Sequence, residues 1–166
     1  MRVGEGDGHY FVVDGRKWRA TDPGIPDPFR VELVAELMDA RRAVKGARGD
    51  EELTAAARTR VQDVKVALGE RGEQWWESAS AEGLRVRLTA AMRTLLRHRD
   101  AEKTICPSDA ARVVGGVSWR SVMDEAREVA YGLADQGLLE IRQHGDKVDG
   151  RTAKGPIRLA RGPVFS

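Results

Sequence analysis

The order of elements expected between Thr104 and Arg161 constrains the fold of this chain more than any other feature. The stretch begins with the signals of a helix start, because Pro107 suits a first helical position and Asp109 would lie in the first turn. A short apolar segment follows, and the pair Gly115-Gly116 predicts a turn after it. The first part of the stretch is therefore a short helix followed by a tight turn.

A longer amphipathic helix is expected after the glycine pair. Ser118 is suited to cap its N-terminus and Gly137 to end it. Its apolar side chains recur at helical spacing: Trp119, Val122, Met123, Ala126, Val129 or Ala130, and Leu133. These positions cover about four turns at 3.6 residues per turn.

Two strand-like segments complete the stretch. Leu138–Gln143 and Pro156–Arg161 both alternate apolar with charged residues, as half-buried strands do. Between them lies a polar segment containing Asp149-Gly150, so we expect a β-hairpin with a long tip. Helix, turn, longer helix and hairpin form the element order of a winged helix-turn-helix.

The first half of the chain predicts a different arrangement. His9–Val13 and Arg16–Ala20 flank Asp14-Gly15, a strong two-residue hairpin signal. From Pro28 an amphipathic helix of about 17 residues is expected, with Asp27 placed to cap it. A second helix follows a glycine-containing loop and would pair with the first as an antiparallel hairpin.

The fold class predicted is therefore α+β and mainly helical. An N-terminal β-hairpin with a helical hairpin would occupy residues 1–79, and a winged helix residues 80–166, either packed together or joined by a short linker. Trp75-Trp76 are expected to help seal the small N-terminal core rather than to stack on a ligand. A helix from Ala81 or Glu82 to His98 would lead into the winged helix.

That leading helix carries five arginines, for which two interpretations stand. They are Arg85, Arg87, Arg93, Arg97 and Arg99. A solvated charged face is the favoured interpretation, and contact with phosphates is the alternative.

The composition limits the cellular locations expected for this chain. The apolar segments are far shorter than the roughly 20 residues of a transmembrane helix, so no membrane association is expected. Met1–Gly8 lacks the apolar core of a secretory signal, and the single cysteine, Cys106, excludes an internal disulfide framework. We expect a cytoplasmic protein. Its net charge of +2 is too small to indicate a nucleic-acid partner by itself.

Particular segments of the second half resemble a known family. They are Thr104-Ile105-Cys106-Pro107-Ser108, Trp119-Arg120 and Gly155-Pro156-Ile157-Arg158-Leu159. Over Leu84 to Gly162 the chain resembles a family of small bacterial domains regarded as winged-helix-like and of unknown function. The resemblance implies a fold and no activity. The first half, including Asp14–Pro23 and Val66–Gly72, is similar to short hypothetical bacterial proteins, some of which carry transporter-type names.

Double-stranded DNA is one partner that a winged helix would bind. The N-terminal end of the recognition helix enters the groove, and basic residues of the wing contact phosphates. The residues expected in these two roles are Ser118, Arg120 and Ser121 on the helix, and Arg142, Lys147, Arg151, Lys154 and Arg158 on or near the wing.

A protein partner or homodimer is the close alternative. Asp124, Glu125 and Glu128 would lie on the outer side of the recognition helix and repel a DNA backbone. Winged helices also serve as protein-docking modules, so the fold alone does not decide between the two partners.

No enzyme activity, metal or other cofactor is expected. Cys106 at a helix N-terminus could be reactive, but a small capping residue is the favoured interpretation. The histidines at positions 9, 98 and 144 do not form ligand pairs with the cysteine. No glycine-rich phosphate-binding loop occurs in the sequence.

Overall fold

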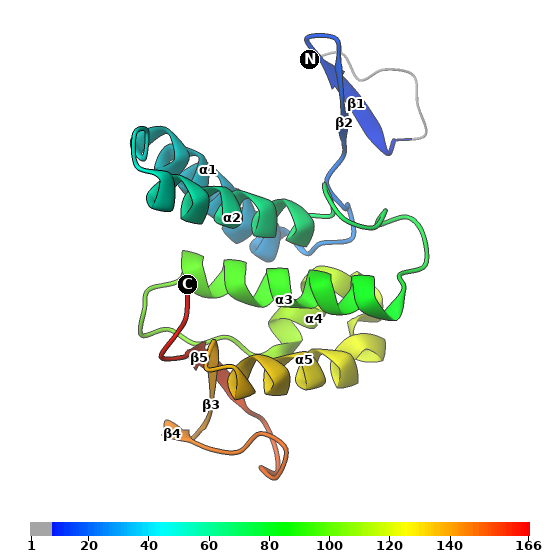
Figure 1. Ribbon diagram of the computed structural model, residues 1–166. Coiled ribbons are helices and arrows are strands. Elements are labelled where there is room, and N and C mark those ends of the chain that lie inside the picture. Colours follow the sequence, from blue (N-terminus) through cyan, green and yellow to red (C-terminus); the bar gives the residue numbers. More distant parts are fainter. Residues whose placement is uncertain (1–7) are drawn as a thin grey trace.

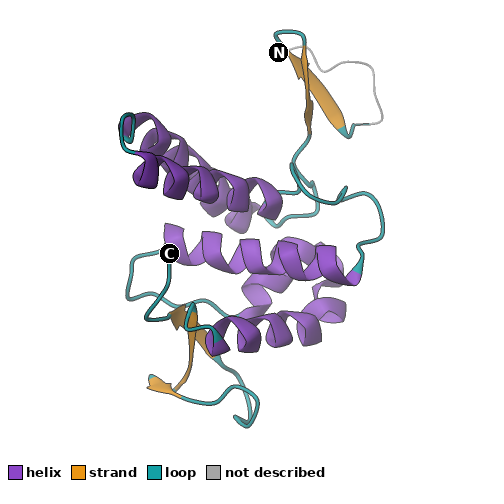
Figure 2. Cartoon of the chain, in the orientation of Figure 1, coloured by secondary structure: helices purple, strands orange, loops and turns teal. Residues whose placement is uncertain are grey.

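The computed structural model describes residues 8–166 and confirms a mainly helical α+β fold. Within this range, helices form the body of the molecule and two small antiparallel sheets lie at opposite ends of it (Figures 1 and 2). No described helix is long and apolar enough to cross a membrane. The segment for which the sequence predicts no secretory signal, Met1–Gly8, lies outside the described residues except for Gly8.

The N-terminal hairpin has the expected turn. Strand β1 (Tyr10–Val13) pairs antiparallel with β2 (Arg16–Arg19). Asp14 and Gly15 connect them with φ values of 49° and 76°, the pair of positive values that a tight hairpin turn of this handedness requires. Figure 1 shows this hairpin projecting from the helical body.

Helices α1 (Asp27–Gly46) and α2 (Glu51–Ala67) form the predicted helical hairpin, with one correction at its start. Asp27 does not cap α1, because Pro26 occupies the cap position with φ −57° and ψ 138°. The Asp27 carboxylate instead pairs with Arg30 one turn later, at 2.7 Å. The second helix begins at a true side-chain cap, where the Asp50 carboxylate accepts a hydrogen bond from the amide of Leu53.

Helix α3 (Ala81–His98) is the central element of the molecule. Ser80 caps it through a hydrogen bond from the Gly83 amide, and the helix then lies between the α1–α2 hairpin and the C-terminal helices (Figure 1). Leu88, Met92 and Leu95 on its inner side are fully buried. One contiguous apolar core therefore contains residues from both halves of the chain.

The C-terminal elements follow the winged-helix order. Helix α4 (Pro107–Gly115) begins at the predicted proline and is followed by a 3-10 helix, η1 (Gly116–Val122), and by α5 (Met123–Asp135). Strand β3 (Leu139–Gln143) then lies between β4 (Asp146–Lys147) and β5 (Arg158–Arg161). Ile105 adds an antiparallel bridge to Leu159, so the wing is tied to the segment before α4.

The long helix of this module starts later than the sequence predicts. Ser118 is not its cap: the residue lies inside η1 with φ −95° and ψ 18°, and α5 begins at Met123. Close packing explains why the backbone forms the tighter 3-10 helix η1 here instead of the first turns of α5. Gly116 has φ +55°, and a Cβ on it would lie only 2.8 Å from the carbonyl oxygen of Gly24, so the N-terminal connection presses on this turn.

The paired tryptophans do not join the helical core. Trp75 and Trp76 are half-buried and pack against the N-terminal hairpin, where the Trp76 ring stacks on His9 with centroids 4.0 Å apart. The Trp75 indole donates a hydrogen bond to the carbonyl of Ala20 at 2.9 Å. The prediction that these residues seal the helical hairpin was wrong, because α3 covers that surface instead.

Candidate nucleic-acid interface

Four of the five arginines on α3 or at its C-terminal cap are paired with carboxylates of the N-terminal half, and only Arg85 is exposed. Arg87 pairs with Asp22 at 2.8 Å, Arg97 with Asp63 at 2.6 Å and Arg99 with Glu32 at 2.8 Å. Each of these partners lies in the N-terminal half of the chain. These arginines therefore link the two halves, and for them the solvated face expected from the sequence was wrong. Arg85 is exposed, as that interpretation expects.

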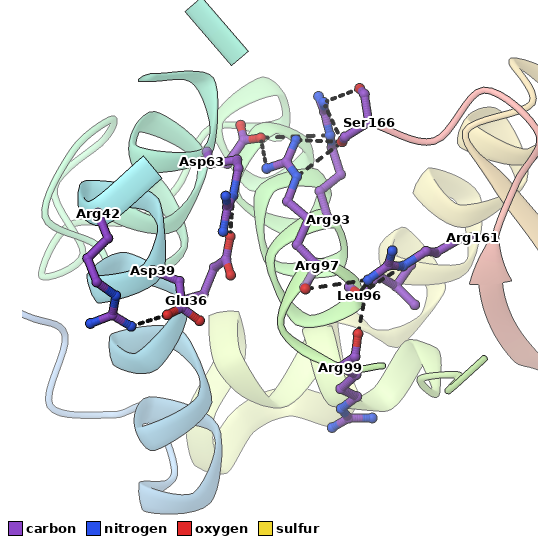
Figure 3. Close-up of polar contacts among 11 residues, drawn as sticks. Glu36, Asp39, Arg42, Asp63, Arg93, Leu96, Arg97, Arg99, Arg161 and Ser166 are labelled. Atoms are coloured by element: carbon purple, nitrogen blue, oxygen red, sulfur yellow. Dashed lines mark hydrogen bonds and ion pairs between the residues drawn. The ribbon is translucent and has the colours of Figure 1, made fainter. Parts of the chain in front are cut away.

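Figure 3 shows the largest of these polar clusters, at the contact between α2 and α3. Arg93 and Arg97 both approach the Asp63 carboxylate, and both donate hydrogen bonds to Ser166 at the other end of the chain. Burial lowers the pKa of Arg97, whereas its hydrogen bond to Asp63 acts in the opposite direction. For Arg99 the hydrogen bond to Glu32 is the larger influence and raises its pKa.

The recognition-helix residues expected to approach DNA lie on η1 and are exposed. The Arg120 guanidinium lies over the ring of Trp119, 4.5 Å from its centroid, and makes no ion pair with the described residues. The Ser121 hydroxyl donates to the carbonyl of Ser118 at 2.8 Å. Both serines line a cleft of about 880 Å³ that also includes Trp75 and part of α3. They thus face a cavity as well as solvent.

The five basic residues assigned to the wing divide into two groups. Arg142, Arg151 and Arg158 are held by other residues of the chain, whereas Lys147 and Lys154 are exposed and have no hydrogen bond or ion pair from their side chains to the described residues. Free cations are the ones that can neutralise phosphates without first breaking an intramolecular contact.

One of these intramolecular contacts ties the wing to α5. Arg151 donates two hydrogen bonds to the two carboxylate oxygens of Asp135, at 3.0 and 2.7 Å. This paired arrangement lowers the pKa of Asp135 and raises that of Arg151. Arg158 is held in a comparable way, since it donates to both oxygens of Thr104 and to the sulfur of Cys106.

The exposed side of α5 carries uncompensated acid, as the sequence indicates. Asp124 and Glu128 are exposed and form no ion pair with the described residues, whereas Glu125 lies 3.5 Å from Arg85. The surface made by η1, α5 and the wing is therefore of mixed sign. Its positive charge is concentrated at the two ends, on η1 and on the wing.

The described residues offer one weak alternative to a binding surface. Glu36, Asp39 and His98 have potential metal-ligand atoms within 4.8 Å of one another. However, Glu36 already accepts a hydrogen bond from Arg60 at 2.8 Å, and Asp39 already pairs with Arg42 (Figure 3). A cation would have to displace or overcome two guanidinium groups there.

The helical order, the tethered three-stranded wing and the exposed η1 define a winged-helix type of α+β protein. Residues 85–162, which run from α3 to the end of β5, match the family described as protein of unknown function (DUF3253). The match does not extend to β1, β2, α1 or α2. No curated protein matches the chain.

Proposed function

We propose that this protein is a non-enzymatic DNA-binding or regulatory accessory protein of the cytoplasm, which contacts double-stranded DNA through η1 and the wing. The observation that supports the proposal is the position of the free cations Arg120, Lys147 and Lys154. They belong to the two parts that winged helices present to the groove and to the flanking phosphates. Asp124 and Glu128 on α5 oppose close approach of the helix itself, so the wing supplies most of the affinity.

Salt dependence tests the proposal. Three phosphate contacts predict that log K for a short duplex falls with log salt with a slope of about −3, because each contact releases about 0.9 counterions. Changing both Lys147 and Lys154 to alanine should flatten the slope by about 2. Fluorescence anisotropy with a labelled duplex measures both quantities.

The control variant is Lys45→Ala, which removes an exposed lysine from the far end of α1 and should leave the slope unchanged. The DNA proposal fails if no binding occurs at low salt. It also fails if Lys45→Ala weakens binding as much as the double wing variant does.

A protein-docking or dimerisation role is the second candidate, and Val117 favours it. This residue of η1 is 99% exposed, which is unusual for a β-branched apolar side chain, and α5, which follows η1, carries the exposed acids Asp124 and Glu128. A partner with an apolar residue and basic residues around it would match this surface. Light scattering on the intact protein and on Val117→Ser tests for a homodimer: a dimer that dissociates in the variant favours docking over DNA.

A further inference from the structure

The helical hairpin contains a cleft whose charged residues all have the same sign. The cleft has a volume of about 660 Å³ and lies between the second half of α1 and the middle of α2. Three of its lining residues are arginines, Arg41, Arg58 and Arg71, and none is acidic. The remaining lining residues are Val44, Thr59, Val61 and Gln62.

These arginines differ from those of α3 because carboxylates do not neutralise them. Arg41 and Arg58 are exposed, and their side chains have no hydrogen bond or ion pair with the described part of the chain. Arg71 donates only to the neutral amide oxygen of Gln62, at 2.7 Å. Like charges around one cavity raise each other's energy, and an anion bound between them would remove that repulsion.

A buried lysine adds to the positive charge beside the cleft. Lys65 is 6% exposed, and its ammonium lies 4.9 Å from the centroid of the Trp18 ring. Arg16, on the projecting hairpin, lies over the same ring at 4.3 Å. Burial is the main cause that lowers the pKa of Lys65, and Arg71, Arg41 and Arg16 lower it further.

Among the described residues, Glu70 is the carboxylate that acts on Lys65. Glu70 acts to raise the pKa of Lys65, but its side chain also accepts a hydrogen bond from the Thr21 hydroxyl at 2.9 Å. The single negative charge of Glu70 cannot neutralise the positive charges of all the cations described above: Arg16, Arg41, Arg58, Lys65 and Arg71. The positive charge is therefore a property of the site and not of one exposed side chain.

We propose that the cleft lined by Arg41, Arg58 and Arg71 binds the phosphate groups of a polyanionic ligand. Each guanidinium presents a planar set of N–H donors that fits two phosphate oxygens at once. The cavity exceeds the size of one phosphate and falls within the range of small-molecule sites, and Val44 and Val61 supply an apolar wall. A nucleoside polyphosphate and the backbone of a nucleic-acid strand share the chemistry that this site recognises.

This site is separate from the proposed DNA-binding surface. The cleft belongs to the α1–α2 hairpin, which packs on one side of α3, whereas the wing packs with α5 on the other side (Figure 1). Failure of one site therefore does not imply failure of the other.

The test is isothermal titration of the full chain at low salt with three probes: inorganic pyrophosphate, ATP and a 12-nucleotide single strand. At least one probe should bind, and Arg58→Glu should weaken its binding about tenfold or more, because it removes a charge-assisted contact and adds a repulsive charge. Arg58→Lys should retain part of the affinity, since lysine keeps the charge but loses the planar fork. Arg58 is exposed, so these variants are expected to fold, which circular dichroism checks.

The matched control is Arg48→Glu, which makes the same charge change in the loop between α1 and α2, outside the cleft lining. Binding of pyrophosphate or ATP with loss only in Arg58→Glu supports a small phosphorylated ligand. Binding of the single strand alone, with the same selective loss, supports a nucleic-acid backbone. No binding of any probe, or equal losses in Arg58→Glu and Arg48→Glu, overturns the proposal.

Discussion

Arginine side chains perform three different tasks in this protein, and burial and partners distinguish them. Arg97 is almost fully buried and pairs with Asp63, so it stabilises the contact between α2 and α3. Arg42 makes an exposed ion pair with Asp39, which adds little to the free energy of unfolding because water and salt screen the two charges. Arg58 has no partner in the described residues and is available to a ligand.

Asp63→Ala should lower the free energy of unfolding by about 2 kcal/mol, because it leaves Arg97 buried without its carboxylate. Asp39→Ala removes the exposed pair on α1 and should cost less than about 0.5 kcal/mol. Urea denaturation followed by circular dichroism measures both changes (positions in Figure 3). If the two variants lost the same free energy of unfolding, the difference in stability assigned to the buried and the exposed ion pair would be contradicted.

At the scale of elements, the turn between α4 and α5 is the most constrained segment of the winged helix. It must pass beneath the connection that contains Gly24, and only a residue without a side chain fits at Gly116, where φ is +55°. The following residues form η1 rather than the first turns of a longer α-helix. This places Ser118 and Ser121 along a cleft with Trp75 of the N-terminal half.

Gly116→Ala should destabilise the protein by about 2 kcal/mol or more, because it adds backbone strain to a contact of 2.8 Å with the Gly24 carbonyl oxygen. Gly132→Ala is the matched substitution within α5, where an added Cβ meets nothing within 4 Å. It should stabilise the helix by up to about 1 kcal/mol. Thermal unfolding measures both, and a neutral Gly116→Ala would contradict the packing described for this turn.

For the whole molecule, α3 decides how the two halves are related. Its buried residues contact α1 and α2 on one side and α4 and α5 on the other, within one continuous core. The boundary expected near residue 79 therefore falls immediately before the helix that both halves share. We expect the two parts to unfold together, although the family match covers residues 85–162 and not the N-terminal helices.

Leu33→Ala tests this coupling. Leu33 lies on α1 and is fully buried, so its truncation should cost about 3 kcal/mol. If the halves unfold as a unit, slowly exchanging amides of α5 and β3 should lose protection as much as those of α2 do. Native-state hydrogen exchange measures this, and unchanged protection in α5 and β3 would show that the halves unfold independently.

The sequence by itself was sufficient for the local elements. The period of apolar residues identified the helices, and Asp14-Gly15 identified the N-terminal turn, because these signals act over a few residues. Alternation in Leu138–Gln143 likewise predicted β3 and the wing. Errors of start position, at Asp27 and Ser118, arose where a neighbouring contact or proline competed with an ordinary cap.

Prediction of the candidate site was less complete. Lys147 and Lys154 lie free on the wing, as a phosphate-contacting role requires, but nothing local indicated that Asp135 holds Arg151 or that Thr104 and Cys106 hold Arg158. The sequence also gave no sign of the cleft at Arg41, Arg58 and Arg71, whose members are up to 30 residues apart.

The sequence by itself thus determined the order of elements between Thr104 and Arg161: helix, turn, helix and wing. It could do so because the period of apolar residues and the chemistry of turns are local properties. Only the tertiary structure decided which charges are neutralised and which remain free. The partners of Arg87, Arg97 and Arg99 lie 65, 34 and 67 residues away along the chain. Such pairings depend on the packing of α3 against both halves, and no local pattern specifies that packing.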